Sequence, residues 1–183
     1  DVYIAQFSTS GTLNWLKTAG GPQDDQALCV ATNAAGDVLV GGNFSGPADF
    51  SAGAPFTNAQ NADAYTARYA RSGLGIASTA MGSDAGYSDS VHAVAWGPSG
   101  EHFAAGAYEK TMALAGRTLT SAGSDDAFVA KFDDQGQPVW AVGFGGTMWD
   151  SADAVAVDSA GNVFVAGTYA NSLSIGANTI TSN

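Results

Sequence analysis

The residues that could bind a metal ion or move a proton are few in this sequence. There are two histidines, His92 and His102, and a metal centre built on them would need a further ligand. Glu101 precedes His102, but neighbouring residues of a strand point to opposite faces of a sheet. We therefore expect a structural role for both histidines.

Acidic residues form a second group, at points where turns are expected. Their carboxylates could offer oxygens to Ca²⁺ at Asp24-Asp25, Asp125-Asp126, Asp133-Asp134 and Asp158. A calcium loop needs acidic or amide side chains at alternating positions plus a distant carboxylate, and the fragment 158–162 has too few. Asp and Asn in turns usually hydrogen-bond their own backbone. We expect no cofactor, with Ca²⁺ at the acidic turns as the lesser alternative.

The nucleophilic residues also point away from catalysis. The single cysteine, Cys29, lies in the apolar run 27–31, and the equivalent positions elsewhere in the chain hold Ala93 and Ala154. This is typical of a small buried apolar side chain rather than a reactive thiol. A nucleophile elbow, a phosphate-binding glycine loop and a defined pair of carboxylates are all absent from the sequence. The sequence predicts no catalytic residues and a protein that is not an enzyme.

Aromatic residues give the best candidates for contact with a partner. Trp15 and Trp140 occupy equivalent positions, which is typical of core residues. Trp149 has no such counterpart and lies beside Met148 in a long connection, and Tyr87 lies in the corresponding connection of the middle third. Because exposed aromatic side chains often anchor protein contacts, we predict Trp149, Met148 and Tyr87 as partner contacts.

These residues are carried by a unit that occurs three times. The segment Asp1-Val2-Tyr3-Ile4-Ala5-Gln6-Phe7 returns at 63–69 and 126–132, and glycines follow ten and nineteen residues after each opening Asp. The predicted repeats are 1–62, 63–125 and 126–183, and a fixed period of this size is the signature of a repeat architecture. We expect the opening residues Asp1, Asp63 and Asp126 to bond to turns.

Each repeat predicts four short strands and no helix. In the third repeat, alternating apolar and polar residues with turn signals between them predict strands at 127–132, 138–144, 154–158 and 162–167. The polar segment 168–183 could add a short outer hairpin. The expected fold class is therefore all-β, with one small antiparallel four-stranded sheet per repeat.

Such small sheets cannot bury both faces alone and must stack on one another. A radial β-propeller and a linear β-solenoid both satisfy this requirement. The third strand of each repeat carries small side chains on one face, at Cys29 and Ala31, Ala93 and Ala95, and Ala154 and Ala156. Small residues suit strands that converge on a central axis, which favours the propeller.

Composition limits the partners. A net charge of −11 lacks the basic surface that nucleic acids or anionic lipids require. No apolar stretch approaches the ~20 residues that span a bilayer, so we expect no membrane insertion.

The repeat resembles the bacterial seven-bladed β-propeller (SBBP) family and, more distantly, NHL-type repeats. The segment from Asp126 to Gly167 carries the likeness most clearly, through Asp-Ala-Phe, Trp140, Gly145-Gly146 and Ala-Val-Ala-Val-Asp-Ser-Ala-Gly-Asn-Val-Phe-Val-Ala-Gly. The second repeat departs from it at Ala77 and His102. The resemblance implies a propeller of a secreted or cell-surface bacterial protein, and it implies no catalytic motif.

The three repeats in this chain are too few to close a propeller of four to eight blades. The chain begins with two outer strands and ends with two inner ones. Further repeats in a longer polypeptide would complete the ring, or two copies would assemble head-to-tail. We expect a non-catalytic extracellular scaffold for protein interaction, acting through the connections Gly20–Gln26, Gly82–Ser90 and Gly145–Ala152. A carbohydrate-binding module and a propeller hydrolase fragment are the alternatives.

Overall fold

The strands of the described residues all pair in antiparallel fashion. The computed structural model describes residues 1–182 except 51–53, 58–60 and 83–86. The described residues form no helix. Accordingly, this part of the chain has no helix long and apolar enough to cross a membrane. The all-β prediction is confirmed.

Fourteen strands follow one another along the described chain: β1 (Val2–Phe7), β2 (Leu13–Ala19), β3 (Asp25–Thr32), β4 (Val38–Ser45), β5 (Ala62–Tyr69), β6 (Gly75–Met81), β7 (Asp89–Trp96), β8 (His102–Leu114), β9 (Arg117–Phe132), β10 (Pro138–Phe144), β11 (Asp150–Val157), β12 (Val163–Tyr169), β13 (Ser172–Ile175) and β14 (Asn178–Thr181). They form two four-stranded sheets, β3-β4-β5-β6 and β7-β8-β9-β10, and three two-stranded sheets, β1-β2, β11-β12 and β13-β14. Consecutive strands are neighbours throughout, so each sheet is a simple meander.

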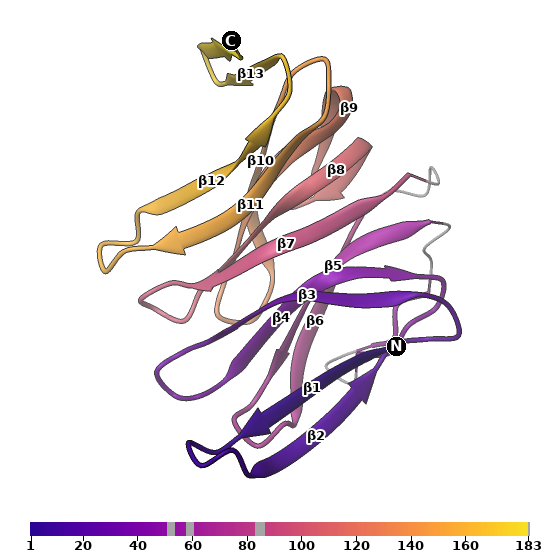
Figure 1. Cartoon of the computed structure of the whole chain (residues 1–183), viewed down its shortest axis with the longest axis vertical. Coiled ribbons are helices and arrows are strands. Elements are labelled where there is room, and N and C mark those ends of the chain that lie inside the picture. Colours follow the sequence, from indigo (N-terminus) through magenta and orange to yellow (C-terminus); the bar gives the residue numbers. More distant parts are fainter. Residues whose placement is uncertain (51–53, 58–60, 83–86, 183) are drawn as a thin grey trace.

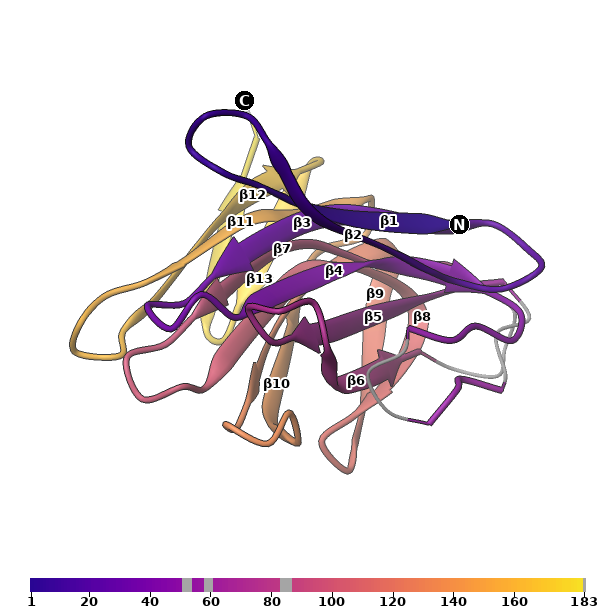
Figure 2. The ribbon, with the colours of Figure 1, turned by 90° about the horizontal axis from the view of Figure 1, so that it is seen from below.

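The sheets lie in sequence order along the long axis of the molecule (Figure 1). Strand β7 contacts β3, β4 and β5 of the preceding sheet, and β11 contacts β7, β8 and β9 in the same way. Along that axis, β3, β7 and β11 lie on one side of the stack, and β6 and β10 lie on the other (Figure 2). Each four-stranded sheet therefore combines the third and fourth strands of one repeat with the first and second strands of the next. We call the third strands of the repeats, β3, β7 and β11, the leading strands.

Tight turns between the strands explain the recurring glycines. Gly11, Gly73 and Gly136 have φ angles of 81°, 82° and 84°. This left-handed region is strained for residues with a Cβ. Each of these three glycines donates its N–H to the residue three positions earlier, Ser8, Ala70 or Asp133. The spacing of ten residues from the opening Asp thus fixes where the first hairpin of each repeat turns.

The predicted outer hairpin forms at the end of the chain. Its counterpart in the preceding repeat is longer than the sequence indicated. β13 and β14 pair at the end of the chain. In the preceding unit the equivalent hairpin is continuous with β8 and β9, which pair from Leu114↔Arg117 back to His102↔Phe132. The strand expected at 127–132 therefore begins at Arg117. The local pattern missed this extension because its residues Thr118 to Asp125 are mostly polar.

The core lies between successive sheets rather than within one of them. One cluster joins Val2 and Ile4 of β1 to Val40, Tyr65 and Tyr69 of the second sheet. A second cluster joins Leu39 and Ala64 of that sheet to residues of the third, including Val91, Phe128 and Phe132. Burial of apolar area at these junctions is the main source of stability, as the repeat architecture requires.

Candidate functional site

The predicted partner contacts Met148 and Trp149 lie at the solvent surface, between β10 and β11. Their side chains are 48 % and 50 % exposed. The carbonyl oxygen of Trp149 accepts a hydrogen bond of 3.1 Å from the N–H of Ala170, which holds the backbone at the end of β12. An exposed indole on a fixed backbone can contact a partner with little loss of conformational entropy.

The third predicted contact, Tyr87, lies elsewhere. Its side chain is partly buried, and the Nζ atom of Lys110 lies 5.9 Å from the centre of its ring. Four residues of its connection, 83–86, are outside the described residues. Within the described part, no hydrogen bond or ring contact joins Tyr87 to Trp149, so the structure does not bring the three predicted residues into one site.

The first connection, Gly20–Gln26, is tied to the second sheet. Gly20 forms a β-bridge with Asp49, and the N–H of Gly21 donates to Oδ2 of Asp25 over 2.7 Å. It carries no aromatic residue. Of the three connections expected to bind a partner, the one after β10 therefore has the most accessible apolar side chains.

His102 is a core residue. Its side chain is buried and stacks on Phe132 with ring centres 4.8 Å apart and an interplanar angle of 6°. Burial, aided by the positive charge of Arg68, lowers its pKa to about 4, so the ring is neutral at pH 7. This environment agrees with the structural role expected from sequence.

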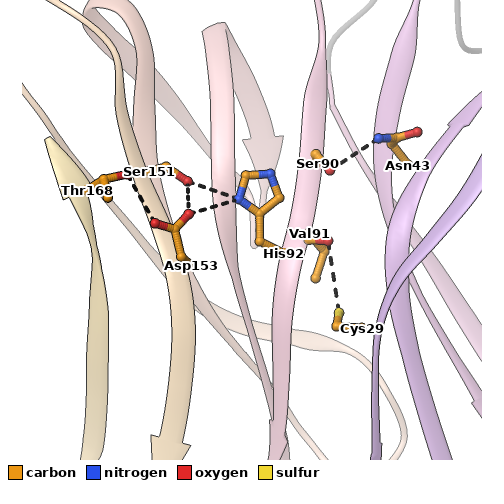
Figure 3. A network of polar contacts seen from close by, with 8 residues as sticks. All are labelled: Cys29, Asn43, Ser90, Val91, His92, Ser151, Asp153 and Thr168. Atoms are coloured by element: carbon orange, nitrogen blue, oxygen red, sulfur yellow. Dashed lines mark hydrogen bonds and ion pairs between the residues drawn. The ribbon is translucent and has the colours of Figure 1, made fainter. Parts of the chain in front are cut away.

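His92 takes part in a polar network between two sheets (Figure 3). Its Nδ1 lies 2.9 Å from Oγ of Ser151 and 3.5 Å from Oδ1 of Asp153, both on β11. Ser151 donates to Asp153 over 2.6 Å, and Thr168 donates to the other carboxylate oxygen over 3.1 Å. The Ser151 hydrogen bond, with those from Thr168 and His92, lowers the pKa of Asp153.

This network contains a serine, a histidine and an aspartate, but its geometry differs from a catalytic triad. In a triad the carboxylate and the hydroxyl contact different nitrogens of the imidazole, which can then pass a proton between them. Here Ser151 and Asp153 both face Nδ1 of His92. The arrangement can link β7 to β11, but it has no relay for activating the hydroxyl.

The acidic turns bond to themselves. Oδ1 of Asp133 accepts hydrogen bonds from the N–H groups of Gln135 and Gln137, and Oδ1 of Asp158 accepts from Ala160 and Asn162. Among the described residues no group of three His, Cys, Asp or Glu side chains could hold a metal ion. These carboxylates therefore serve their own turns.

Sequence reasoning missed a second recurring aspartate, at the start of the third strand of each repeat. Asp25, Asp89 and Asp150 are 6 %, 1 % and 1 % exposed. They stand 24, 26 and 24 residues after the opening aspartates, and the middle spacing contains the two extra residues of the second repeat. That constant spacing was the signal that could have revealed them.

The two aspartates of each repeat meet across adjacent sheets, beside a glycine. A Cβ on Gly20 would lie within 3 Å of oxygens from both Asp1 and Asp25, at 2.9 Å and 2.4 Å. Gly82 and Gly145 follow the second strands of the other two repeats. A Cβ on Gly82 would contact Asp63, and a Cβ on Gly145 would contact Asp126.

The buried carboxylates carry part of the turn structure. Oδ2 of Asp126 accepts from the N–H of Ala122 over 3.0 Å, a bond within β9 rather than to a turn, and Asp150 accepts from Gly146 over 2.6 Å. Burial raises the pKa of Asp89 to about 8, with the charge of Asp63 contributing, and burial also raises the pKa of Asp126.

An apolar groove of about 600 Å³ opens between β1 and β3. Its lining includes Tyr3 and Phe7 from β1 and Leu28, Cys29 and Val30 from β3. Burial raises the pKa of the Cys29 thiol to about 12, so it is protonated and inert at pH 7. The groove offers apolar surface and no reactive group.

Comparison with known proteins adds no assignment. No family model matches this chain. A search of curated proteins finds no relative. The function is therefore inferred from the residues and the fold.

Proposed function

We propose that this chain is part of a β-propeller that serves as a non-catalytic, extracellular scaffold for protein interaction or surface structure. The observation that carries the proposal is that successive sheets repeat the same contacts with one another. Strand β7 contacts β3, β4 and β5, and β11 contacts the equivalent strands β7, β8 and β9. A constant rotation from each sheet to the next, as in a propeller, would produce such equivalent junctions.

The side chains of the leading strands support a ring rather than a linear stack. β3, β7 and β11 lie on the same side of the molecule and carry Cys or Ala at equivalent positions (Figure 2). Small side chains allow strands to converge near an axis, whereas a linear solenoid has no such requirement. The resemblance of the repeat to the SBBP family supports the same fold and an extracellular location.

The absence of an activated nucleophile supports a binding role. Within the described residues the only Ser, His and Asp that meet are Ser151, His92 and Asp153, and both partners of the imidazole use one nitrogen. The connection between β10 and β11 exposes two adjacent large apolar side chains, Met148 and Trp149. We propose this connection as the contact site for a protein partner.

The test is retention of extracellular proteins on the immobilised chain. Secreted and cell-surface proteins of the encoding organism would be passed over the wild type, over Trp149→Ser and over Leu74→Ser, and the retained proteins identified by mass spectrometry. Leu74 is a matched control because it is 70 % exposed but lies in the turn after β5. We expect a defined set of proteins whose retention falls about tenfold in Trp149→Ser, the factor for a loss of about 1.4 kcal/mol, and holds in Leu74→Ser.

Two assays give the competing outcomes. Binding on a glycan array, with no retained protein, would assign a carbohydrate-binding module instead. Turnover in a survey of hydrolase substrates would assign an enzyme. Either result would overturn the proposed scaffold function.

A further inference from the structure

We infer that the two ends of this chain complete each other between copies, with β12 of one copy pairing with β1 of a second in a head-to-tail assembly. The inference rests on the proposed function in one respect, because it treats the sheets as equivalent units of one propeller. It names the partner of the two end sheets as a second copy of this chain.

The sheets β1-β2 and β11-β12, which we call the end sheets, each have two strands, whereas the sheets β3–β6 and β7–β10 have four. Among the described residues β1 pairs only with β2, and β12 pairs only with β11. In the complete sheets the strand equivalent to β12 pairs with the strand equivalent to β1, as β4 with β5 and β8 with β9. The end sheets are thus the two halves of one four-stranded sheet.

The register of the missing pairing follows from the two complete examples. The fourth strand of a repeat begins opposite the last residue of the next repeat's opening segment. These pairs are Val38↔Tyr69 and His102↔Phe132. The equivalent pair is Val163 with Phe7 of the second copy. The same register places Tyr169 opposite Asp1 and Val165 opposite Ala5.

An exposed aromatic residue lies where β1 would pair with β12 of the other copy. Tyr65 and Phe128, at the third position of the motif, are fully buried, but the equivalent Tyr3 is 73 % exposed. Each buried ring meets an aromatic partner from the fourth strand, Phe44 or Tyr108. At the equivalent fourth-strand position stands Tyr169, so Tyr169 and Tyr3 of a second copy would form the third such pair.

The groove beside β3 exposes a residue that is covered at the equivalent position of β7. Val94 of β7 is 9 % exposed because the sheet before it covers that strand, whereas the equivalent Val30 of β3 is 66 % exposed. In the complete case β4 lies against Val94, since a Cβ on Gly41 would be 3.0 Å from Val94, and Leu39 on the same face of β4 belongs to one apolar cluster with Val94. The equivalent of Leu39 is Phe164, which is 59 % exposed on β12. Phe164 of one copy would therefore cover Val30 of the next.

A third contact repeats on the second strand. Trp15 lies over the turn at Gly73, with ring atoms 3.2 Å from a Cβ position there, and Ala77 lies 3.4 Å from the same point on Gly136. At Gly11, the equivalent turn glycine of the first repeat, no atom lies within 4 Å of that position. The residue equivalent to Trp15 and Ala77 is Trp140, so its indole would cover Gly11 of the second copy.

The two halves cannot meet within one copy, because β1 and β12 lie at opposite ends of the stack (Figure 1). Two copies of this three-repeat segment would supply six blades, which lies within the four to eight blades of closed rings. We therefore infer a closed dimer with two identical junctions rather than an open filament.

The test is the mass of the chain in solution, measured by sedimentation equilibrium over a range of concentrations. We expect a dimer of the 18.4 kDa chain. Tyr3→Asp should weaken dimerisation at least about 100-fold, because it places a carboxylate at a buried aromatic position. The matched control Leu74→Asp should change the dimerisation constant less than about threefold. Leu74 is about as exposed as Tyr3, and its counterpart Gln137 is exposed although it lies between β9 and β10 of a complete four-stranded sheet.

Cross-linking tests the register without depending on dimer strength. In a Cys29→Ala background, the pair Ala5→Cys and Val165→Cys should give a covalent dimer on mild oxidation. The shifted pair Gln6→Cys and Val165→Cys should not, because a one-residue shift turns the side chain to the other face. Cys29→Ala is a conservative change, since Ala stands at the equivalent positions 93 and 154.

The outcomes separate this inference from the proposed function. A monomer at every concentration would overturn the second copy as partner and would favour further repeats of a longer polypeptide. A dimer that tolerates Tyr3→Asp, or that cross-links equally in both cysteine pairs, would place the interface elsewhere. The scaffold proposal is judged separately, by protein retention that depends on Trp149.

Discussion

At the scale of single residues, the main finding is a buried aspartate at the start of β3, β7 and β11. Asp25, Asp89 and Asp150 are almost fully buried at the start of the leading strands. Burial favours the neutral form of a carboxyl group unless hydrogen bonds compensate. These side chains couple the stability of the fold to pH.

Asp89 should make the protein less stable as the pH rises. Its pKa of about 8 in the fold lies above the ordinary value of 3.8, so the folded chain keeps a proton that the unfolded chain releases. The free energy of unfolding should therefore fall between about pH 4 and about pH 8, by at most about 1.4 kcal/mol per pH unit. In Asp89→Asn this decline should be smaller in urea titrations, with exposed Asp24→Asn as the control. An unchanged decline in Asp89→Asn would contradict the assignment.

His102 should act in the opposite direction at acid pH. Its pKa of about 4 in the fold is below the ordinary 6.5, so the unfolded chain takes up a proton first and the fold loses stability as the pH falls through this range. His102→Val, which copies Val38 and Val163, should lose less stability between about pH 6.5 and about pH 4. NMR titration of the His102 ring gives a direct check. A midpoint near 6.5 in the folded protein would contradict the burial argument.

At the scale of elements, each leading strand contains a bulge opposite a glycine of the fourth strand. The register shifts between Ala27 and Cys29 and between Val91 and Ala93. A Cβ on the facing Gly106 would lie 1.9 Å from the carbonyl oxygen of Ser90. Only glycine lets the two backbones approach this closely.

Gly106→Ala should therefore destabilise the protein by about 3 kcal/mol, the upper range for an overpacked core. The control is Gly11→Ala, where no atom lies within 4 Å and the cost is only that of a left-handed residue, about 1 kcal/mol. Urea denaturation of both variants measures the difference. Equal losses would show that backbone conformation, rather than the contact with Ser90, requires glycine at position 106.

At the scale of the whole molecule, stability depends on junctions between neighbouring sheets. The two large apolar clusters each draw on two successive sheets. In such arrays the end units are protected on one side only and open most readily.

Hydrogen exchange should show this gradient and its dependence on assembly. Amides of β4, β5, β8 and β9 should exchange slowest, because each of these strands is paired on both sides. Amides of β1 and β12 should exchange at least about tenfold faster in Tyr3→Asp than in the wild type, since the inferred dimer protects both edges. Mass spectrometry of peptides from these strands gives the comparison. Identical exchange in the two proteins would mean that these edges are not in an interface.

The sequence alone determined where the strands of a repeat lie, the hairpin turns and the class of the fold. These features depend on local signals: alternation over six or seven residues, a glycine that must adopt positive φ, and a repeat that returns these signals in phase. β10 was predicted with its observed limits, Pro138–Phe144. Local signals did not reveal the length of β9, whose first half is polar.

Only the tertiary structure decided which residues share an environment. It placed Tyr87 apart from Trp149, joined His92 to Ser151 and Asp153, and buried a second aspartate in every repeat. It also left Tyr3 exposed while burying Tyr65 and Phe128, although the three share one motif position. The physical reason is that a strand's pattern specifies which face is apolar, but burial depends on whether a neighbouring sheet is present to cover that face.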